Sequence, residues 1–489
     1  MDILSLIIDS DSYKTSHWVQ YPPNTTEMFS YFESRGSDNK TFTHSVFFGL
    51  QYYLKEYLSK PITIDQVNEA QEFCNAHGVP FNYDGWKYIV EKHDGYLPVR
   101  IKAVPEGSVI PLHNILLSVE STDPEVFWVV SYIETLLVRL WYPITVATQS
   151  YFIKQDIQKF AEMTCDPDYS GVNFQLHDFG GRGVTCREQA MIGGAAHLVN
   201  FRGSDTMAGI WMANKYYNCY MSGFSIPASE HSTITMWGKD RETDAYRNML
   251  EKYKDSYIFA CVSDSYDIYN AVENIWGGEL RDQVLARDGF VVVRPDSGDP
   301  IQVVSKIIDV MAERFGYTVN SKGYKVLNHV RIIQGDGVDA NLIKGLLTVI
   351  TKKGYSSENL NFGSGGALLQ KMNRDTLKFA FKCSYAKVDG KDVEVFKTPI
   401  TDPGKNSKTG KLDLYCELGK VATTEGPASR SMMETVFENG KIFKEYTFDE
   451  IRNNTETMYS QYIGWMDIYT IQDNGGHYHY VKHTKVISR

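Results

Sequence analysis

Between residues 289 and 370, short apolar runs alternate with loops rich in glycine and acidic residues. The runs are Phe290–Val293, Val330–Ile333 and Leu360–Phe362. Because β-branched and bulky residues dominate them without regular polar alternation, the runs are typical of strands buried on both faces. In the two intervening segments, 301–314 and 340–353, apolar residues recur every three or four positions, as on one face of a helix. The pattern predicts strand–helix units in series around a parallel sheet.

The loops after these runs are candidates for chemistry, because ligands bind at the carboxyl ends of parallel strands. They are Arg294–Gly298, Gln334–Gly337 and Gly363–Gly366. Glycine lets backbone amides approach a phosphate, and a helix N-terminus adds partial positive charge. Carboxylates can bind sugar hydroxyls or a metal that a phosphate carries. A single loop of this kind would indicate only a turn, whereas three at one edge of one sheet favour a binding site.

Four more apolar runs upstream end in polar loops, at 174–179, 200–201, 224–227 and 258–262. Seven strand ends in total predict an α/β fold with a TIM-like barrel that is irregular or incomplete. The rest of the chain mixes short strands, helices and turns, which predicts a second, mixed α+β domain. We expect the barrel-like catalytic domain at residues 151–384 and the mixed domain at residues 1–150 plus 385–489.

Local signals predict further elements in the N-terminal third. The apolar residues Leu4–Ile8 indicate a first strand. A capping-box pattern from Thr122 predicts a helix to about Trp141, which Pro143 would end. A separate helix is expected over 150–163.

Composition narrows the classes of function. The chain has 489 residues, of which 43% are hydrophobic, and its formal net charge is −10. This charge argues against a nucleic-acid surface. Since no apolar run approaches the roughly 20 residues that cross a bilayer, no membrane partner is expected. Seven cysteines without a C-x-x-C pair fit a reducing, cytoplasmic compartment better than a disulfide framework.

His231 is the most suggestive single residue, because it follows a strand and Pro227 at the predicted barrel mouth. It could be a base, a metal ligand or a phosphate acceptor, or it could cap the next helix. The pair His177–Asp178 is a weaker candidate, since a strand turns neighbours to opposite faces. The barrel region has no H-x-H or H-E-x-x-H motif, so a protein-held metal is not expected. The histidines at 477, 479 and 483 form a weaker cluster in the tail.

Cations and aromatic residues next to the glycine loops could bind a phosphorylated ligand with a flat ring. Arginine beside such loops suits bidentate phosphate contacts, and an aromatic side chain outside the apolar runs can stack on a ring. Ion pairs and core packing are the alternative roles. The residues concerned are Arg182, Arg294, Arg374, Phe179 and Tyr13.

Eight segments occur in a fixed order between about residues 7 and 450. They are Asp11–Lys14, Gln20–Thr25, His177–Gly180, Glu230–Thr235, Ser263–Asn270, Arg294–Gly298, Gln334–Gly337 and Phe362–Gly366. Together they resemble the nicotinamide phosphoribosyltransferase family of type II phosphoribosyltransferases. The resemblance implies a barrel-like α/β domain with a second domain, in a homodimer whose active sites are shared between subunits.

The resemblance also implies an activity in the salvage of NAD. The 5-phosphoribosyl group of 5-phosphoribosyl 1-diphosphate would be transferred to nicotinamide, giving nicotinamide mononucleotide and diphosphate. Mg²⁺ would be bound with the diphosphate, and ATP would be hydrolysed as a co-substrate through a phosphohistidine.

Site residues follow from the same resemblance. The catalytic residues would be His231, which is phosphorylated, Asp264, which orients it, and Asp296. Phe179 and the partner subunit's Tyr13 would sandwich the pyridine ring, and Asp205 would accept from the carboxamide NH₂. The other substrate-binding residues would be Asp11, Arg182, Ser225, Arg294, Gly335, Asp336, Gly365 and Gly366. Arg374, Lys382 and the partner subunit's Arg35 would bind the diphosphate or the phosphates of ATP.

Three features depart from the family pattern. Ala380 stands where a serine hydroxyl near phosphate is expected, Gly181 replaces a tyrosine, and the tail from about residue 458 is unfamiliar. A nicotinate-specific relative is the nearest alternative, but the carboxylate of Asp205 would repel an acidic ring. A non-catalytic protein on this scaffold would predict an eroded site, and a metal-dependent barrel lyase would need a cluster of histidine and acidic ligands that the sequence lacks.

Overall fold

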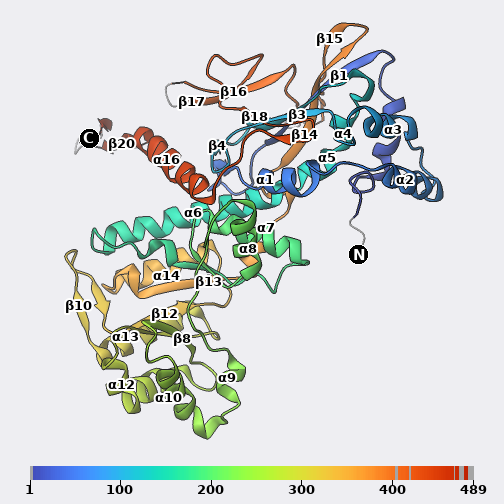
Figure 1. The fold of residues 1–489 in the computed structure, drawn as a ribbon. Coiled ribbons are helices and arrows are strands. Elements are labelled where there is room, and N and C mark those ends of the chain that lie inside the picture. Colours follow the sequence, from blue (N-terminus) through green and yellow to red (C-terminus); the bar gives the residue numbers. More distant parts are fainter. Residues whose placement is uncertain (1–3, 402–405, 418–419, 467, 473–477, 483–489) are drawn as a thin grey trace. The chain divides into compact units, whose positions relative to one another are not determined.

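The computed structural model describes residues 4–401, 406–417, 420–466, 468–472 and 478–482. The chain divides into two compact units. Unit 1 comprises Met1–Thr145, Tyr216–Asn218 and Arg374–Arg489, and unit 2 comprises Val146–Lys215 and Cys219–Asn373. Figure 1 shows the order of the elements along the chain.

Unit 2 contains a curled parallel sheet with helices packed outside it (Figure 1). The strands lie in the order β7-β6-β13-β12-β9-β8, and every neighbouring pair is parallel. The strands are β6 (Leu176–Asp178), β7 (Gly203–Ser204), β8 (Ile258–Val262), β9 (Phe290–Arg294), β12 (Val330–Gln334) and β13 (Leu360–Ser364), and β10 (Tyr317–Val319) forms a hairpin with β11 (Lys325–Leu327). The helices are α7 (Arg187–Leu198), α8 (Met207–Tyr216), α9 (His231–Thr235), α10 (Glu242–Lys252), α11 (Ile268–Asn270), α12 (Arg281–Leu285), α13 (Pro300–Phe315), α14 (Ala340–Lys352) and α15 (Gly366–Leu369), with the π-helix η6 (Ala271–Glu279) and the 3-10 helices η4 (Gly171–Phe174), η5 (Lys239–Arg241) and η7 (Ser357–Asn359).

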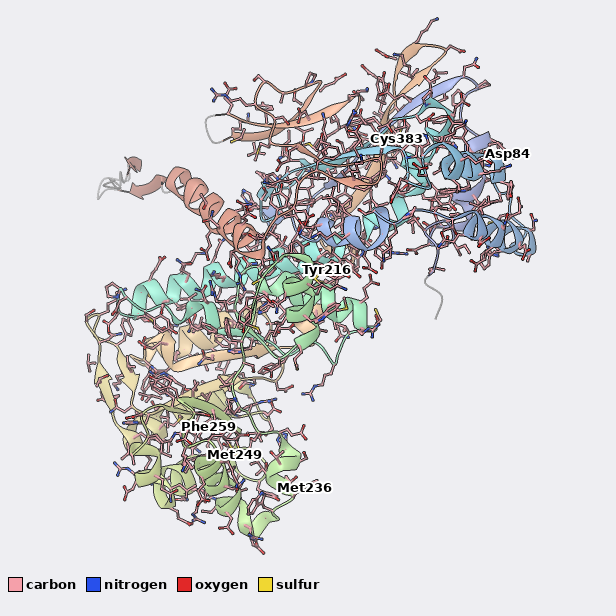
Figure 2. All side chains as sticks on the ribbon, viewed as in Figure 1. Asp84, Tyr216, Met236, Met249, Phe259 and Cys383 are labelled. Atoms are coloured by element: carbon pink, nitrogen blue, oxygen red, sulfur yellow. The ribbon has the colours of Figure 1, made fainter. Side chains whose placement is uncertain are left out.

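Both faces of the central strands are buried, as the apolar runs predict. Val291 and Val293 of β9 pack into the core beneath the helices, whereas Val292 packs on the other face with Ile333. Figure 2 shows Phe259 of β8 near Met249 of α10, and both belong to the core between sheet and helices. The predicted helices α13 and α14 each begin at an aspartate cap, because Asp299 and Asp339 accept from the amides of the first turn.

Five of the seven predicted strands form the sheet. The sixth strand, β7, lies at Gly203–Ser204, just after the predicted run 200–201, and the segment 224–227 does not form a regular strand. It still bonds to both edges, because Phe224 N–H donates to Arg202 O (2.8 Å) and Ala260 N–H donates to Pro227 O (2.9 Å). Pro227 has no N–H of its own, which limits the pairing it can make. The structure thus confirms an α/β fold with a curled parallel sheet, and not a complete barrel of regular strands.

Unit 1 is built on a seven-stranded antiparallel sheet in the order β15-β14-β1-β5-β3-β18-β19. Its strands are β1 (Thr25–Ser34), β3 (Val99–Ala103), β5 (Ile115–Ser121), β14 (Phe379–Val388), β15 (Lys391–Glu394), β18 (Glu434–Glu438) and β19 (Lys441–Ile442). Separate pairs are β2 (His44–Val46) with β4 (Val109–Pro111), β16 (Leu412–Glu417) with β17 (Lys420–Glu425) and β20 (Ile468–Gln472) with β21 (Tyr478–Lys482). The helices are η1 (Ser12–Val19), α1 (Leu50–Tyr53), η2 (Leu54–Leu58), α2 (Ile64–His77), α3 (Tyr83–Lys92), η3 (Pro124–Val126), α4 (Val129–Tyr132), α5 (Glu134–Val138), η8 (Arg374–Thr376) and α16 (Phe448–Met466).

Three predictions for the N-terminal third were wrong. The single helix expected from Thr122 to about Trp141 is instead three short helices, η3, α4 and α5. Leu4–Ile8 forms turns and no strand. Pro143 does not end a helix, since it lies in the first turn of α6 (Trp141–Thr164), where amides have no partner within the helix and proline fits. Among the described residues no single helix could span a bilayer, and only the bent pair Val129–Val138 and Trp141–Thr164 is long and apolar enough together.

Glu106 is a fully buried acid that joins three segments of unit 1. Its carboxylate accepts from Gly49 N–H (2.9 Å), Gln51 N–H (2.6 Å) and the hydroxyl of Tyr217 (3.0 Å). Burial raises the pKa of Glu106 to about 7, although these donors act in the opposite direction. The folded state therefore favours the protonated acid.

This burial predicts that stability falls as the pH rises. Because the folded pKa of Glu106 lies above its ordinary value of 4.5, its contribution is complete below pH 4.5 and is lost as the pH rises through about 7. The loss amounts to about 3 kcal/mol at most. We expect Glu106→Gln to flatten the fall in the free energy of unfolding between pH 5 and 8, measured with urea. Glu72→Gln, an exposed change in the same unit, should leave the slope as in the wild type, and equal slopes for all three chains would contradict the assignment.

Candidate functional site

The carboxyl edge of the parallel sheet carries most of the predicted site residues of unit 2. Since all six strands run in one direction, the loops that follow them lie at one edge. In the order β7, β6, β13, β12, β9 and β8, this edge carries Asp205, then Phe179 and Arg182, then Gly365 and Gly366, then Gly335 and Asp336, then Arg294 and Asp296, and finally Asp264. Ser225 lies in the irregular segment 224–227, which bonds to both ends of the sheet, and His231 follows this segment.

The ring of Phe179 lies directly on the backbone of β13. A Cβ added at Gly363 would be 1.9 Å from Phe179 Cε2, so only glycine leaves room for the ring. Phe179 N–H donates to Ser364 O (2.9 Å), and the guanidinium carbon of Arg294 is 5.5 Å from the ring centroid. The result is a fixed, half-buried aromatic surface that is suited to stacking.

Asp205 lies next to Phe179 along the edge. The strands β6 and β7 pair Asp178 with Ser204, the residues that come immediately before them. The Asp205 side chain is exposed, and the hydroxyl of Ser225 donates to its Oδ1 at 2.5 Å. This contact orients a carboxylate that can accept from an N–H donor and that repels anions.

Arg294 and Asp296 form an ion pair at the end of β9, with 2.8 Å between Arg294 Nη2 and Asp296 Oδ1. A Cβ added at Gly335 would be 3.1 Å from Arg294 Nε, so the guanidinium lies on the bare backbone at the end of β12. Asp336, the next residue, is exposed. Cation, glycine backbone and carboxylates thus meet at neighbouring strand ends, which is an arrangement that suits a phosphorylated sugar.

His231 is the first residue of α9, and its Nε2 lies 3.1 Å from Asp264 Oδ1. The side chain of His231 is 49% exposed, whereas that of Asp264 is 2% exposed. A buried carboxylate at this distance orients the imidazole and stabilises positive charge on it. The sequence left open whether His231 caps a helix; it starts one, but its ring faces Asp264.

In the pair His177–Asp178, the Asp178 side chain is fully buried and His177 is half-buried. Burial lowers the pKa of His177, and the charge of Asp205 acts against this shift. Burial raises the pKa of Asp178 to about 6. Asp178 accepts from Gly180 N–H through Oδ1 (2.7 Å), so it supports the loop that carries Phe179 and Arg182.

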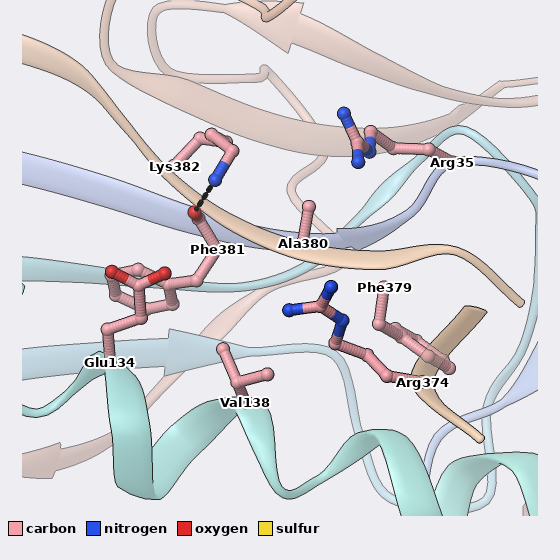
Figure 3. A pocket seen from close by; sticks show the side chains of 8 residues that line it. All are labelled: Arg35, Glu134, Val138, Arg374, Phe379, Ala380, Phe381 and Lys382. Carbon is pink, nitrogen blue, oxygen red and sulfur yellow. Dashed lines mark hydrogen bonds between the residues drawn. The ribbon is translucent and has the colours of Figure 1, made fainter. Parts of the chain in front are cut away.

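A cationic pocket lies in unit 1, at the end of β14 (Figure 3). It encloses about 90 Å³ and is lined by Arg35, Glu134, Val138, Arg374, Phe379, Ala380, Phe381 and Lys382. Burial lowers the pKa of Lys382, and the nearby Arg35 and Arg374 add to this shift. Arg35 Nε is buried without a hydrogen-bond partner. Three cations around a small cavity are the arrangement expected for a compact anion.

The pocket brings together three residues that the resemblance divides between subunits. Arg35 was expected to act from the partner subunit, and Arg374 and Lys382 from the chain itself. Within one chain the three residues line one pocket, because Ser34 of β1 pairs with Phe379 of β14. Ala380, the expected serine, also lines it. Sequence reasoning missed Glu134, and no motif in α5 marks it.

The predicted stacking residue Tyr13 lies on η1 and is 59% exposed. The helix η1 is fixed within unit 1, because Lys14 Nζ donates to Ser131 O (2.9 Å) and Glu134 (2.7 Å). Asp11, which precedes η1, accepts from the hydroxyl of Thr135 (2.7 Å). Tyr13 is thus an exposed aromatic residue on a firmly held support. The histidines of the tail lie outside the residues whose side chains the structure describes.

Two family descriptions match the sequence. The "Nicotinate phosphoribosyltransferase (NAPRTase) family" matches residues 174–441, and "Nicotinamide phosphoribosyltransferase, N-terminal domain" matches residues 5–101. The chain is 49% identical over 463 residues to a nicotinamide phosphoribosyltransferase of Xanthomonas campestris pv. campestris (strain 8004). The alignment covers 92% of this chain and 98% of the relative. It is 32% identical over 487 residues to a protein of that name from Acinetobacter baylyi, covering 90% and 95%.

Among solved structures, a nicotinate-nucleotide pyrophosphorylase from Pyrococcus furiosus resembles the chain with a TM-score of 0.60. The sequences are 16% identical, and the match covers 95% of this chain and 98% of that one. At this identity the likeness supports the fold alone.

Proposed function

We propose, on the premise that the chain belongs to the nicotinate phosphoribosyltransferase family, that it acts on nicotinamide. It transfers the 5-phosphoribosyl group of 5-phosphoribosyl 1-diphosphate to nicotinamide, giving nicotinamide mononucleotide and diphosphate, a step in NAD biosynthesis. Its curated relatives of nearly full length carry the name nicotinamide phosphoribosyltransferase. The seven free cysteines are in keeping with a cytoplasmic location.

The choice of nicotinamide rests on one observation, the oriented carboxylate of Asp205 beside the ring of Phe179. A pyridine ring stacked on Phe179 would present its substituent to the neighbouring strand end. A carboxamide there donates from its NH₂ to Asp205, whereas the carboxylate of nicotinate would meet a like charge. Selection between the two bases therefore follows from a hydrogen bond and a repulsion.

The transfer forms a bond between the pyridine nitrogen and C1 of the ribose and breaks the bond from C1 to the diphosphate oxygen. The nitrogen attacks with its lone pair and carries no proton, so the reaction needs no strong base. It needs the ring held in line and the leaving charge neutralised. Stacking on Phe179 supplies the first, and the ribose and its phosphate are held by Arg182, Arg294, Asp296, Gly335, Asp336, Gly365 and Gly366.

The leaving diphosphate fits the cationic pocket of Arg35, Arg374 and Lys382. These residues line one cavity of one chain. If the partner subunit supplies Arg35 to an active site, it therefore also supplies Arg374 and Lys382. We therefore propose a homodimer in which one subunit contributes this pocket with Asp11 and Tyr13, and the other contributes the strand-end loops. The exposed ring of Tyr13 supports a contact with a ligand held by a second copy.

Mg²⁺ would be bound with the diphosphate, because no group of three or more His, Cys, Asp or Glu residues in the described part of the chain could hold the ion alone. Asp264 and Asp296 follow the paired strands β8 and β9, and carboxylate oxygens are ligands that Mg²⁺ prefers. When bound with the diphosphate, the cation neutralises charge on the leaving group. The protein's own part is to hold the two carboxylates at adjacent strand ends.

We further propose that ATP phosphorylates His231. If Nε2–H donates to Asp264, the lone pair of Nδ1 can attack the γ-phosphorus, with release of ADP. The P–N bond forms as the P–O bond breaks, and Asp264 balances the charge that develops on the imidazole. The phosphoryl group adds roughly −1.5 to −2 charges near the diphosphate end of the substrate, if it resembles other phosphorylated side chains. It can therefore help to hold Mg²⁺ and tighten substrate binding, and water later cleaves the P–N bond.

One assay tests the reaction as a whole. Purified chain is incubated with 5-phosphoribosyl 1-diphosphate, Mg²⁺ and either nicotinamide or nicotinate, with and without ATP, and the mononucleotides are quantified by chromatography. We expect the amide product to form in preference to the acid product, and faster with ATP. A chain that made only the nicotinate product would contradict the proposal.

Base selectivity should depend on Asp205. Asp205→Asn removes the charge that repels nicotinate and weakens acceptance from the carboxamide, so discrimination should fall by roughly 1–3 kcal/mol. The measurement is the ratio of kcat/KM for nicotinamide and nicotinate. Asp240→Asn, an exposed change in the 3-10 helix η5, serves as the control. An unchanged ratio in Asp205→Asn would refute this role of Asp205.

Shared sites predict complementation between two inactive chains. Tyr13→Ala and Phe179→Ala each remove one of the two aromatic rings that would enclose the pyridine ring. Mixing the two variants should therefore restore some activity, because a hybrid dimer contains one intact site. In the control, Tyr13→Ala is mixed with the double variant Tyr13→Ala/Phe179→Ala, which leaves no site intact. If the subunits are shown to exchange and activity stays absent from the first mixture, the sites are not shared.

Loss of His231 should separate ATP use from transfer. His231→Ala should abolish ATP hydrolysis and its stimulation of the transfer together, while a slow ATP-independent transfer remains because the ring site is intact. Asp264→Asn keeps the size of the partner but not its charge, and should lower ATP hydrolysis without abolishing it. Both are measured by parallel assays of ADP and mononucleotide. Coupled hydrolysis that persists in His231→Ala would place the phosphate elsewhere.

A further inference from the structure

Asp178 is buried beneath the loop that carries Phe179 and Arg182, and only part of its carboxylate is satisfied. Its Oδ1 accepts from Gly180 N–H (2.7 Å), and its backbone oxygen accepts from Asp205 N–H (2.9 Å). The second carboxylate oxygen, Oδ2, is buried without a hydrogen-bond partner. A buried acceptor left in this way indicates that a donor belongs beside it.

Thr206 offers that donor. Its Oγ1 is also buried without a hydrogen-bond partner. The two side chains flank one glycine of α7, because a Cβ added at Gly194 would be 3.4 Å from Asp178 Oδ2 and 3.0 Å from Thr206 Cγ2. The nearby Thr206 hydroxyl also acts to lower the pKa of Asp178, against the larger effect of burial. The two unpartnered oxygens thus belong to side chains that lie beside the same glycine.

Thr206 also explains the glycine at position 181, where the family pattern has a tyrosine. A Cβ added at Gly181 would be 2.8 Å from Thr206 Oγ1, 3.0 Å from its Cγ2 and 3.3 Å from its Cβ. The φ of Gly181 is not in the left-handed region, so backbone conformation does not require glycine here. The side chain of Thr206 occupies the space that a residue at 181 would need.

We propose that Thr206 is a positioning residue for the nicotinamide ring and forms a matched pair with Gly181. Its hydroxyl donates to Asp178 Oδ2, and its side chain fills the space beneath Gly181, so that it supports the loop from Phe179 to Gly183. Thr206 also directly follows Asp205. One side chain thus sets both the stacking surface and the carboxylate that the base would contact, an inference that rests on the proposed function.

The matched pair is tested with a double-mutant cycle on the KM for nicotinamide. Gly181→Ala should raise this KM about tenfold, because the added methyl pushes the loop away from Thr206. Thr206→Ala should raise it by a similar factor, since the hydroxyl and the packing are lost. In Gly181→Ala/Thr206→Ala the added methyl enters the vacated space, so the KM should be no higher than in Thr206→Ala alone. Effects that multiply to about a hundredfold would show independent roles and overturn the pair.

The hydroxyl is tested separately. Thr206→Val keeps the shape and removes the donor, so the KM for nicotinamide should rise about tenfold, whereas Thr206→Ser keeps the donor and should stay within about threefold of the wild type. If Thr206→Val does not fold, as judged by its melting transition, the contrast between Thr206→Ser and Thr206→Ala decides. Equal KM values for Thr206→Ser and Thr206→Ala, or a wild-type KM in Thr206→Val, would overturn the role of the hydroxyl.

Two controls keep this inference distinct from the proposed function. Gly183→Ala lies in the same loop, but its Cβ would approach chiefly the end of the flexible Gln370 side chain (Oε1 2.7 Å, Cδ 3.2 Å), with Gly180 O at an ordinary contact distance of 3.4 Å, so its KM should match the wild type. A rise in Gly183→Ala equal to that in Gly181→Ala would assign the effect to the loop in general and overturn the pair. Mononucleotide formation by the wild-type chain tests the proposed function by itself, whatever the variants do.

Discussion

The parallel pairing of β7, β6, β13, β12, β9 and β8 directs the loops that follow these six strands to one edge of the sheet. Residues from six separate parts of the sequence therefore meet without any of them being neighbours in the chain. The register decides which residues meet. Because β6 pairs Asp178 with Ser204 of β7, the ring of Phe179 and the carboxylate of Asp205 become adjacent. A shift of one residue would turn one of them to the opposite face of the sheet.

Close approach to bare backbone is the second constraint on the site. Sequence patterns treat a glycine loop as a place where amides meet a phosphate. The structure gives these glycines a further role, because Gly363 lies beneath the ring of Phe179 and Gly335 beneath the guanidinium of Arg294. Because these glycines have no Cβ, they leave space in which a neighbouring side chain can pack against the backbone in one fixed position. Their substitution would therefore disturb the site even where the backbone conformation tolerates another residue.

The sequence predicted the elements whose signals are local. Periodicity identified α13 and α14, and unbroken apolar runs identified β9 and β12, because burial on one or both faces leaves a direct trace in residue order. Features that depend on distant partners could not be predicted in this way. Pro143 was misjudged because its effect depends on where the helix begins, and the sequence does not mark that point clearly.

The same limit holds for the site. The strand-end residues could be placed at one edge from pattern alone, but their roles came from the resemblance. The pairing of Ser34 with Phe379, which gathers Arg35 with Lys382, has no signature in either strand. The contact of Thr206 with Gly181 could not be predicted from the sequence either, since it depends on how two loops pack against each other. Contacts made by residues far apart in sequence are what the structure adds.

The pairing of β1 with β14 has a consequence for biosynthesis. Ser34 donates to Leu377 O across 343 residues of sequence, whereas unit 2 is built from residues between these two strands. On the ribosome, unit 2 can therefore be complete while β1 still lacks its neighbour, since domains fold as they emerge. Until β14 is synthesised, β1 remains an open strand edge, which is a site for aggregation that chaperones commonly shield. On the nascent chain, unit 2 can thus finish folding before unit 1 is complete.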